Sequence, residues 1–320
     1  MDILSHIDWF LILTSLAKTV FLLGVVLTLV SYTVYAERRV SALMQDRLGP
    51  NRTGFPITLL GAKKDFSPFL GGLGQPIADA VKLLLKEDFT PNYVHKLYYW
   101  IAPALGIAAV IVGLAVIPFG STIAGVPMVI ANVDIGPLFI FAISSLGVYG
   151  IVLAGWSSNS KYSFLGGIRS TSQMISYELS LGLSVVPIFL ILGKLNLVAI
   201  IQHQVENGWL LLPGLTAATP RLPTLTEFLL WIPIIISFII FTTAMFAETN
   251  RLPFDLPEAE TELVGGYHTE YSSMKFALFF LGEYAAMILG SALIVVLFLG
   301  GWSAPFIPDG SSGILWGLVN

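Results

Sequence analysis

Residues 9–34 read WFLILTSLAKTVFLLGVVLTLVSYTV, a run in which Lys18 is the one charged residue. A helix needs about 20 apolar residues to cross the hydrocarbon core of a bilayer, so this run predicts a membrane span. A cleaved signal peptide has a shorter apolar core, preceded by basic residues. Here the charges Glu37-Arg38-Arg39 follow the run instead. We therefore expect a permanent membrane anchor.

The rest of the composition fits the same environment. Charged residues make up 11% of the 320 residues and hydrophobic residues 55%, whereas charges are about 25% of a typical soluble chain. So few charges cannot cover a water-exposed surface. We expect an all-α, polytopic protein in which residues 1–320 form one membrane domain with six spans, at about 9–34, 101–119, 135–156, 173–192, 228–247 and 276–302.

Lysine and arginine are divided unequally between the two sets of loops. Loops 35–100, 157–172 and 248–275 hold thirteen of the 16, and the opposite loops hold two. Because basic loops stay in the cytoplasm, this bias predicts an outward amino terminus, with the three basic loops in the cytoplasm or its organellar equivalent. We expect a multi-pass protein of the bacterial inner membrane. We expect Lys18 to snorkel or to be paired locally, and the loop 194–227 to form an irregular outward cap.

Several kinds of chemistry are excluded by missing residues. The chain has no cysteine, which rules out disulfides, thiolate metal sites and Cys-ligated iron–sulfur clusters. Its four histidines are scattered and form no metal-binding motif, and no phosphate-binding glycine motif is present. No basic block with interleaved aromatics suggests nucleic-acid binding. We expect no metal, no bound cofactor and no catalytic residue within this chain.

The first inward loop contains an amphipathic pattern. Pro76 suits the first turn of a helix over 77–87, with apolar residues on one face and Asp79 and two lysines on the other. This helix could anchor the chain in the membrane interface, or form one wall of a mouth for a lipidic substrate. Arg38 and Arg47 could likewise be ordinary inward anchors, or point into a binding site.

The loop between the last two spans is unusually acidic. Residues 247–271 read AETNRLPFDLPEAETELVGGYHTEY. Asp255 and Glu258 resemble a capping box for a short helix that ends at Gly265-Gly266, with Glu258 and Glu262 on one face and Glu260 on the other. A solvated acidic loop is one interpretation. The proline and aromatic residues favour a segment that packs against the spans.

Three glutamates lie within or at the end of predicted spans: Glu178, Glu248 and Glu283. An ionised carboxylate at the bilayer centre costs on the order of 3 kcal/mol, so such residues commonly serve a function such as proton relay. We expect them to cluster beneath the acidic loop, with Tyr177 and Tyr284 extending the path. The alternative is that each carboxyl is neutral and bonds a neighbouring helix.

The motifs together resemble the H-subunit family of respiratory complex I, NADH:quinone oxidoreductase, whose mitochondrial members are called subunit 1. The match covers most of the chain up to Trp302. The residues that carry it are Ala36–Arg39, Gln45–Arg52, Ala78–Lys82, Ala154–Tyr162, Ser176–Glu178, Glu248–Arg251, Pro253–Asp255 and Glu258–Glu283.

This resemblance implies a membrane subunit of a proton-pumping enzyme that forms the quinone chamber. The partners would be the other membrane-arm subunits, membrane lipid, and peripheral-arm subunits that carry NADH, FMN and the iron–sulfur clusters. Charges at Arg169 and Arg251 would be structural. The implied quinone entrance comprises Glu37, Arg38, Arg47, Asp79, Phe254 and Asp255. The implied proton path comprises Glu178, Glu248, Glu258, Glu260, Glu262, Glu270, Glu283, Tyr177 and Tyr284.

Other functions stay open at this point. A related complex driven by ferredoxin or hydrogen would use an equivalent subunit. An ion-coupled transporter would explain the buried carboxylates but predicts an internal repeat, and none is visible. A structural anchor for soluble subunits would explain the basic loops alone. Family members generally continue for two more helices beyond the point where this sequence stops, so we expect either a truncated chain or a related form without them.

Overall fold

A computed structural model describes residues 9–50, 72–123, 126–213 and 224–303. Six helical segments are long and apolar enough to cross a membrane, which confirms the predicted all-α polytopic class. They are α1 (Trp9–Met44), α3 (Lys96–Leu114), α4 (Gly136–Ser157), α5 (Lys161–Ser184) continued by α6 (Val186–Leu192), α8 (Leu225–Glu248) and α10 (Ser273–Phe298).

Shorter elements lie between the spans. They are α2 (Gln75–Leu85), β1 (Thr122–Ile123), β2 (Val126–Pro127), α7 (Leu197–Asn207), α9 (Glu260–Leu263) and the 3-10 helix η3 (Gly266–His268). The basic residues Arg52, Lys63, Lys64 and Arg221, which contributed to the predicted orientation, lie outside the described residues.

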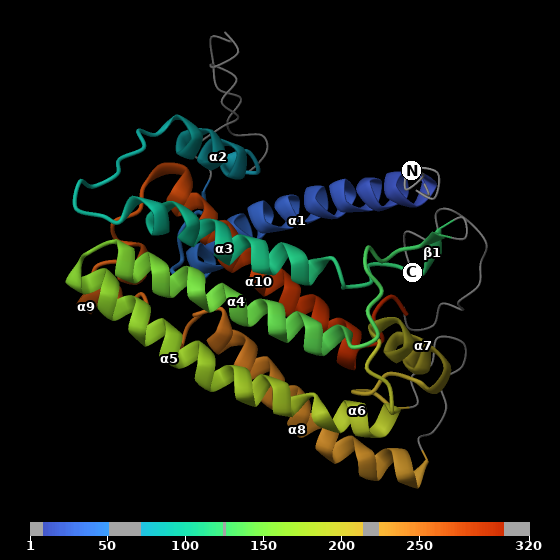
Figure 1. Cartoon of the computed structure of the whole chain (residues 1–320). Helices are drawn as coiled ribbons and strands as arrows, with labels where there is room; N and C mark the ends of the chain where they lie inside the picture. Colours follow the sequence, from blue (N-terminus) through green and yellow to red (C-terminus); the bar gives the residue numbers. More distant parts are fainter. Residues whose placement is uncertain (1–8, 51–71, 124–125, 214–223, 304–320) are drawn as a thin grey trace, which may run out of the picture.

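The spans pack as neighbours in chain order, with α10 closing the bundle. Helix α4 lies between α3 and α5, α8 lies against α5, and α10 returns to pack against α3 (Figure 1). Helix α1 lies at the edge and packs mainly against α10 and α2. The buried core contains large apolar side chains such as Ile188, Phe241 and Phe298.

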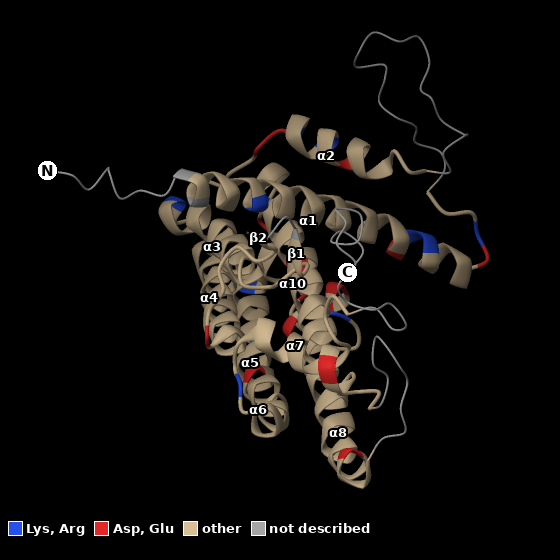
Figure 2. Cartoon of the chain, turned by 90° about the vertical axis from the view of Figure 1, so that its right-hand side faces the viewer, with Lys and Arg blue, Asp and Glu red and all other residues tan. Residues whose placement is uncertain are grey.

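The short elements outside the long helices lie at the two ends of the bundle. Helices α2 and α9 lie at one end, and β1, α6 and α7 lie at the other (Figure 1). Charged residues are sparse along the spans (Figure 2). This two-ended arrangement agrees with the predicted division of the loops, whereas the side that faces the cytoplasm stays a prediction. Lys18 donates from Nζ to the carbonyl oxygen of Val129 at 3.2 Å, which confirms the expected local pairing.

Helix boundaries differ from several predicted spans: α3 begins and ends about five residues earlier than predicted, and the ends of α1 and α5 differ most. Helix α1 continues to Met44, so Glu37 and Arg38 belong to the helix and not to a loop. Helix α5 begins at Lys161 rather than 173, so Glu178 lies well inside it. The early turns of α5 escaped notice because they bury small residues, Ser163, Gly166, Gly167 and Ser170, instead of large apolar ones. Small residues let helices approach closely without raising the hydropathy of the run.

The outward cap is also more regular than expected. Helix α7 occupies residues 197–207, and the Asn196 side chain caps it by accepting hydrogen bonds from the backbone N–H groups of Val198 (3.0 Å) and Ala199 (3.2 Å). An Asn at this position satisfies amide groups that have no partner in the first turn. The prolines further along the loop dominated the prediction of irregular structure.

Two glycines bring the acidic segment, residues 248–271, against α5. A Cβ at Gly166 would lie 2.6 Å from the backbone N of Tyr267. Gly266 has φ +63°, and a Cβ there would lie 2.0 Å from the carbonyl oxygen of Pro257. Neither position accepts a larger residue without displacing backbone.

We therefore expect Gly166→Ala to destabilise the protein by about 1–3 kcal/mol, because overpacking against backbone cannot be relieved by a side-chain rotation. Gly182→Ala is the matched control, since it lies on the same helix and its Cβ would have no heavy atom within 4 Å. Thermal unfolding of both purified variants in detergent measures the difference. Equal melting temperatures would contradict the role of Gly166.

Candidate functional site

The first cavity lies beside the second half of α1 and has a volume of about 960 Å³. We call it the α1 cavity. Three of the residues predicted at the quinone entrance, Glu37, Arg38 and Arg47, line it together. The full lining is Val34, Glu37, Arg38, Ser41, Arg47, Leu48, Gly49, Pro50, Gln75, Phe280 and Tyr284.

Helix α2 closes one side of this cavity. Arg38 Nη1 lies 2.7 Å from Asp79 Oδ2, and Gln75 Nε2 donates to Asp79 Oδ1 at 3.0 Å. Asp79 therefore fixes α2 to α1 without lining the cavity itself. Ile77, Leu84 and Leu85 are exposed on α2, as an amphipathic helix in a membrane interface requires.

Arg251 joins α1 to α10. Its Nη1 donates to Glu37 Oε1 at 3.0 Å, and its Nε forms an ion pair with Glu283 Oε1 at 2.9 Å. The guanidinium also lies 4.5 Å from the ring centroid of Tyr284, whose hydroxyl donates to Glu37 Oε2 at 2.5 Å. Bonds between charged groups of this kind are the stronger class of hydrogen bond. The Arg251 guanidinium therefore pairs with two carboxylates, and these come from helices that are far apart in the sequence.

The side chains of Glu37, Arg251 and Glu283 differ in their exposure to solvent. The side chain of Glu37 is 47% exposed, that of Arg251 is 23% exposed and that of Glu283 is 13% exposed. Glu37 and Tyr284 line the α1 cavity, whereas Glu283 lines a second cavity deeper in the bundle. Arg251 therefore contacts one carboxylate at each cavity.

The second cavity, the central cavity, lies among α3, α4, α5, α8 and α10 and has a volume of about 110 Å³. All three span glutamates, Glu178, Glu248 and Glu283, line it. Its other polar lining residues are Ser144, Thr249, Asn250 and Tyr267, and the remainder is mostly apolar. A volume of this size accommodates several water molecules, since one water needs about 10–15 Å³ by the same measure.

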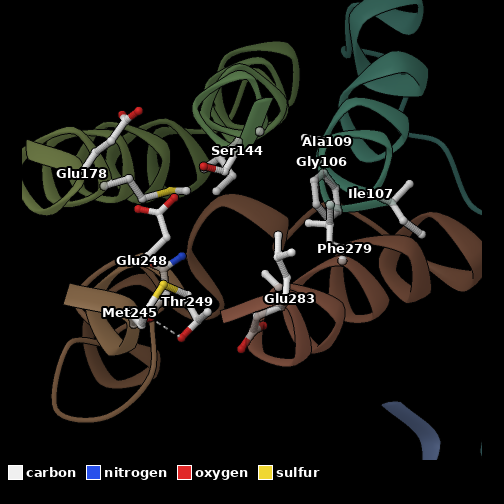
Figure 3. A pocket seen from close by; sticks show the side chains of 18 of the residues that line it. Gly106, Ile107, Ala109, Ser144, Glu178, Met245, Glu248, Thr249, Phe279 and Glu283 are labelled. Atoms are coloured by element: carbon white, nitrogen blue, oxygen red, sulfur yellow. Dashed lines mark hydrogen bonds between the residues drawn. The ribbon is translucent and has the colours of Figure 1, made fainter. Parts of the chain in front are cut away.

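The three carboxyls share the cavity but do not touch. The side chain of Glu248 points toward α5 (Figure 3). The carboxyl groups of Glu178 and Glu283 point away from the Glu248 carboxyl (Figure 3). Among the described residues no hydrogen bond joins any two of these carboxyls, and Glu248 Oε2 is buried without a partner. Proton transfer between them therefore requires water or side-chain movement.

The predicted arrangement of the acidic segment was partly wrong. Helix α9 begins at Glu260 and has no side-chain cap, so Asp255 and Glu258 do not form a capping box. The backbone N–H groups of Glu258 and Ala259 donate instead to the Asp255 carbonyl in a turn, and Ala259 has φ +27°. A backbone with positive φ interrupts a right-handed helix. Glu258 and Glu262 consequently do not share a helix face.

The acids of this segment have different surroundings. Glu258 is partly buried, and burial raises its pKa above the ordinary value while nearby Arg251 opposes the rise. Glu262 reaches the surface and pairs with Arg169 at 2.8 Å. Glu260 is exposed. Glu270 accepts a hydrogen bond from the Tyr93 hydroxyl at 2.9 Å and does not line the central cavity.

Gln173 is a residue that sequence reasoning did not select. Its Nε2 lies 2.9 Å from the carbonyl oxygen of Ala247, 2.8 Å from that of Phe254 and 3.2 Å from Asn250 Oδ1. Tyr177 packs edge-to-face on Phe254 at 5.2 Å. These contacts fix the start of the acidic segment to α5. The available signal was an amide side chain at the start of the predicted span 173–192.

Phe254 and Asp255, predicted at the entrance, line neither cavity. Burial lowers the pKa of His268 to about 4, which keeps this imidazole neutral near pH 7. Within the described ranges, no group of three His, Asp or Glu side chains could hold a metal ion.

The sequence matches a family model described as NADH dehydrogenase over residues 17–320. The chain belongs to the NADH dehydrogenase family. This match includes every motif by which the sequence resembles the complex I family, so that resemblance is confirmed. The residues of both cavities lie within it.

Curated relatives of this NADH dehydrogenase family member are named as the H subunit of NADH-quinone oxidoreductase. A protein of Koribacter versatilis is 44% identical, covering 96% of this chain and 82% of its own length. One of Leptospira biflexa is 46% identical, covering 93% and 78%. One of Rickettsia prowazekii is 50% identical, covering 87% and 70%.

The Arg251–Glu283 pair predicts strong energetic coupling. We expect a double-mutant cycle of Arg251→Gln and Glu283→Gln to give a coupling energy of about 1–3 kcal/mol, because Arg251→Gln leaves the poorly solvated Glu283 carboxylate without its counter-charge, while Glu283→Gln leaves Arg251 with Glu37 alone. The same cycle at the surface pair Arg169 and Glu262 is the control, with an expected coupling of about 0–1 kcal/mol. Denaturation in detergent measures both, and similar values for the two pairs would contradict the bridging role of Arg251.

Glu258 predicts a pH dependence of stability. Its raised folded-state pKa means that its stabilising contribution is present at low pH and is lost as pH rises through that pKa. Glu258→Gln should therefore match the wild type below the ordinary pKa of about 4.3 and become relatively more stable as pH increases. Melting temperatures across pH test this, with exposed Glu260→Gln as the control for net charge. A constant difference at all pH values would contradict it.

Proposed function

We propose that the chain is a membrane subunit of a proton-translocating NADH:quinone oxidoreductase, in which it supplies a quinone-binding cavity and part of a proton path. The curated relatives, each named as the H subunit of an NADH-quinone oxidoreductase, support the assembly. The observation that carries the mechanism is the position of Arg251, which bonds Glu37 at the α1 cavity and pairs with Glu283 at the central cavity.

The α1 cavity has the size and lining that a quinone requires. Sites for small organic ligands are about 300–1,000 Å³, mostly apolar, with a few polar groups that orient the ligand. Val34, Leu48 and Phe280 supply apolar contact for an isoprenoid tail. Arg38 and Tyr284 supply N–H and O–H donors suited to the carbonyl oxygens of the ring, and Glu37 accepts from the Tyr284 hydroxyl.

Reduction of the quinone takes two electrons and two protons and gives the quinol. The electrons would come from partner subunits, in which NADH, FMN and iron–sulfur clusters carry out the preceding transfers. The protons would come from water at the cavity, either directly or through the Tyr284 hydroxyl, which would regain its proton from water, with the Glu37 carboxylate as the acceptor that orients it. This chain therefore contributes binding and proton chemistry.

Arg251 would transmit the charge change of quinone reduction to Glu283 in the membrane interior. Negative charge that develops on the reduced ring before protonation attracts the guanidinium, because unit charges a few ångströms apart interact strongly away from bulk water. Glu283 then loses part of its counter-charge and takes up a proton. Recovery of the Arg251–Glu283 pair after the ring is protonated releases that proton.

The central cavity would carry the proton onward. Glu283, Glu248 and Glu178 surround one water-sized space, to which Ser144 and Thr249 add hydroxyl groups. Since the carboxyls do not contact one another, water molecules in this space would bridge them. Chains of acidic residues and water are the usual form of intramembrane proton relays.

We expect Glu283→Gln and Glu178→Gln, in the assembled complex, each to lower NADH:quinone turnover and proton pumping several-fold, because a carboxamide cannot exchange protons in the relay. Exposed Glu206→Gln on α7 is the control for loss of one carboxylate. Reduction of ferricyanide by NADH, which bypasses the quinone, reports intact electron input. Wild-type turnover and pumping in both relay variants would refute this role.

A further inference from the structure

Lys275 is a buried lysine that the proposed mechanism does not use. The residue is 3% exposed. Its Nζ lies 3.1 Å from Asp88 Oδ1 and donates to Thr90 Oγ1 at 2.6 Å. The ammonium also lies 4.2 Å from the ring centroid of Trp100. Every one of these partners comes from residues 88–100, which comprise most of the connection between α2 and α3 and the first residues of α3.

Two serines beside Lys275 bind the end of α2 and the residues that follow it. Ser272 Oγ donates to the carbonyl oxygen of Phe89 and accepts from its N–H, each at 3.0 Å. Ser273 Oγ lies 3.1 Å from the carbonyl oxygen of Leu83 and 3.0 Å from that of Lys86. We call the contacts of Ser272, Ser273 and Lys275 with residues 83–90 the α2 latch.

The α2 latch continues into the acidic segment. The Tyr99 hydroxyl donates to the carbonyl oxygen of Glu270 at 2.6 Å, and the rings of Tyr99 and Tyr271 stack at 4.1 Å. The end of the acidic segment, the start of α10 and the exit of α2 are therefore held in one place.

Helix α2 depends on these contacts because it has little packing of its own. None of its residues is buried. Its first turns are fixed to α1 by the Asp79–Arg38 pair, and its last turn and the residues after it are held by the latch. A buried ammonium must keep its partners close, because an unpaired charge in an apolar interior is strongly unfavourable. Lys275 therefore dictates where the exit of α2 lies.

We propose that Lys275 is a positioning residue for quinone access: through the α2 latch it sets the width of the α1 cavity at the side that α2 closes. This inference rests on the proposed function, because it takes the α1 cavity as the quinone site. Loss of the lysine charge frees the exit of α2 and leaves Asp88, which is 42% exposed, to be solvated by water. The cavity then binds the quinone less well, while its reacting groups are unchanged.

The test is the kinetics of the assembled complex with a long-tailed quinone as acceptor. Lys275→Met should raise the KM for the quinone by about five- to tenfold and leave kcat within about twofold, the pattern expected when binding alone is lost. Lys275→Arg, which keeps the cation, should restore KM at least in part. Lys161→Met, an exposed lysine at the start of α5, is the matched control and should leave both constants unchanged.

Ser41→Trp separates this inference from the function on which it rests, because Ser41 lines the α1 cavity and a tryptophan there narrows it directly. A raised KM in Ser41→Trp with a normal KM in Lys275→Met overturns the positioning role alone. A normal KM in both overturns the quinone site as well. If Lys275→Met does not assemble, Thr90→Val replaces it, since that change removes one acceptor of the ammonium, and a normal KM in Thr90→Val likewise overturns the positioning role.

Discussion

The structure depends on one cation that two carboxylates share. Arg251 follows α8 and meets Glu37 on α1 and Glu283 on α10, so the last loop of the described chain binds the first span to the last. Few other contacts hold α1 in place, because most of its apolar residues face outward. The same guanidinium contacts one carboxylate at each of the two cavities. In the proposed mechanism, a change of charge in the α1 cavity therefore reaches Glu283 through this one side chain.

The apolar setting determines what these charges can do. A carboxylate in the span of a membrane protein is costly unless it is paired or protonated, and Glu283 is paired whereas Glu248 has an oxygen without a partner among the described residues. The two groups thus respond differently when Arg251 moves. The central cavity provides the space for water that a proton needs to pass between carboxyls that do not touch. Because the carboxyls are separated, proton transfer between them would depend on the presence of water in the central cavity.

The sequence predicted the features that local patterns encode. Long apolar runs located all six spans, and Pro76 with the amphipathic pattern that follows it located α2 to within two residues. Family motifs pointed to Glu37, Arg38 and Arg47, which meet at one cavity. The start of α5 was missed because its buried face is made of glycine and serine. The turn at Ala259 was missed because the close approach of Gly266 to Pro257 is a tertiary constraint. Partners such as Arg251 and Glu37, or Lys275 and Asp88, are distant in sequence and leave no periodic signal.

The central claim is that reduction of the quinone changes the protonation of Glu283 through Arg251. Infrared difference spectroscopy of the assembled complex, recorded before and after quinone reduction, detects this change in the C=O stretch of protonated carboxylic acids. The account predicts a carboxylic acid band that is lost in Glu283→Gln and diminished in Arg251→Gln, with quinone still reduced in the sample. A band of unchanged position and size in both variants would contradict it.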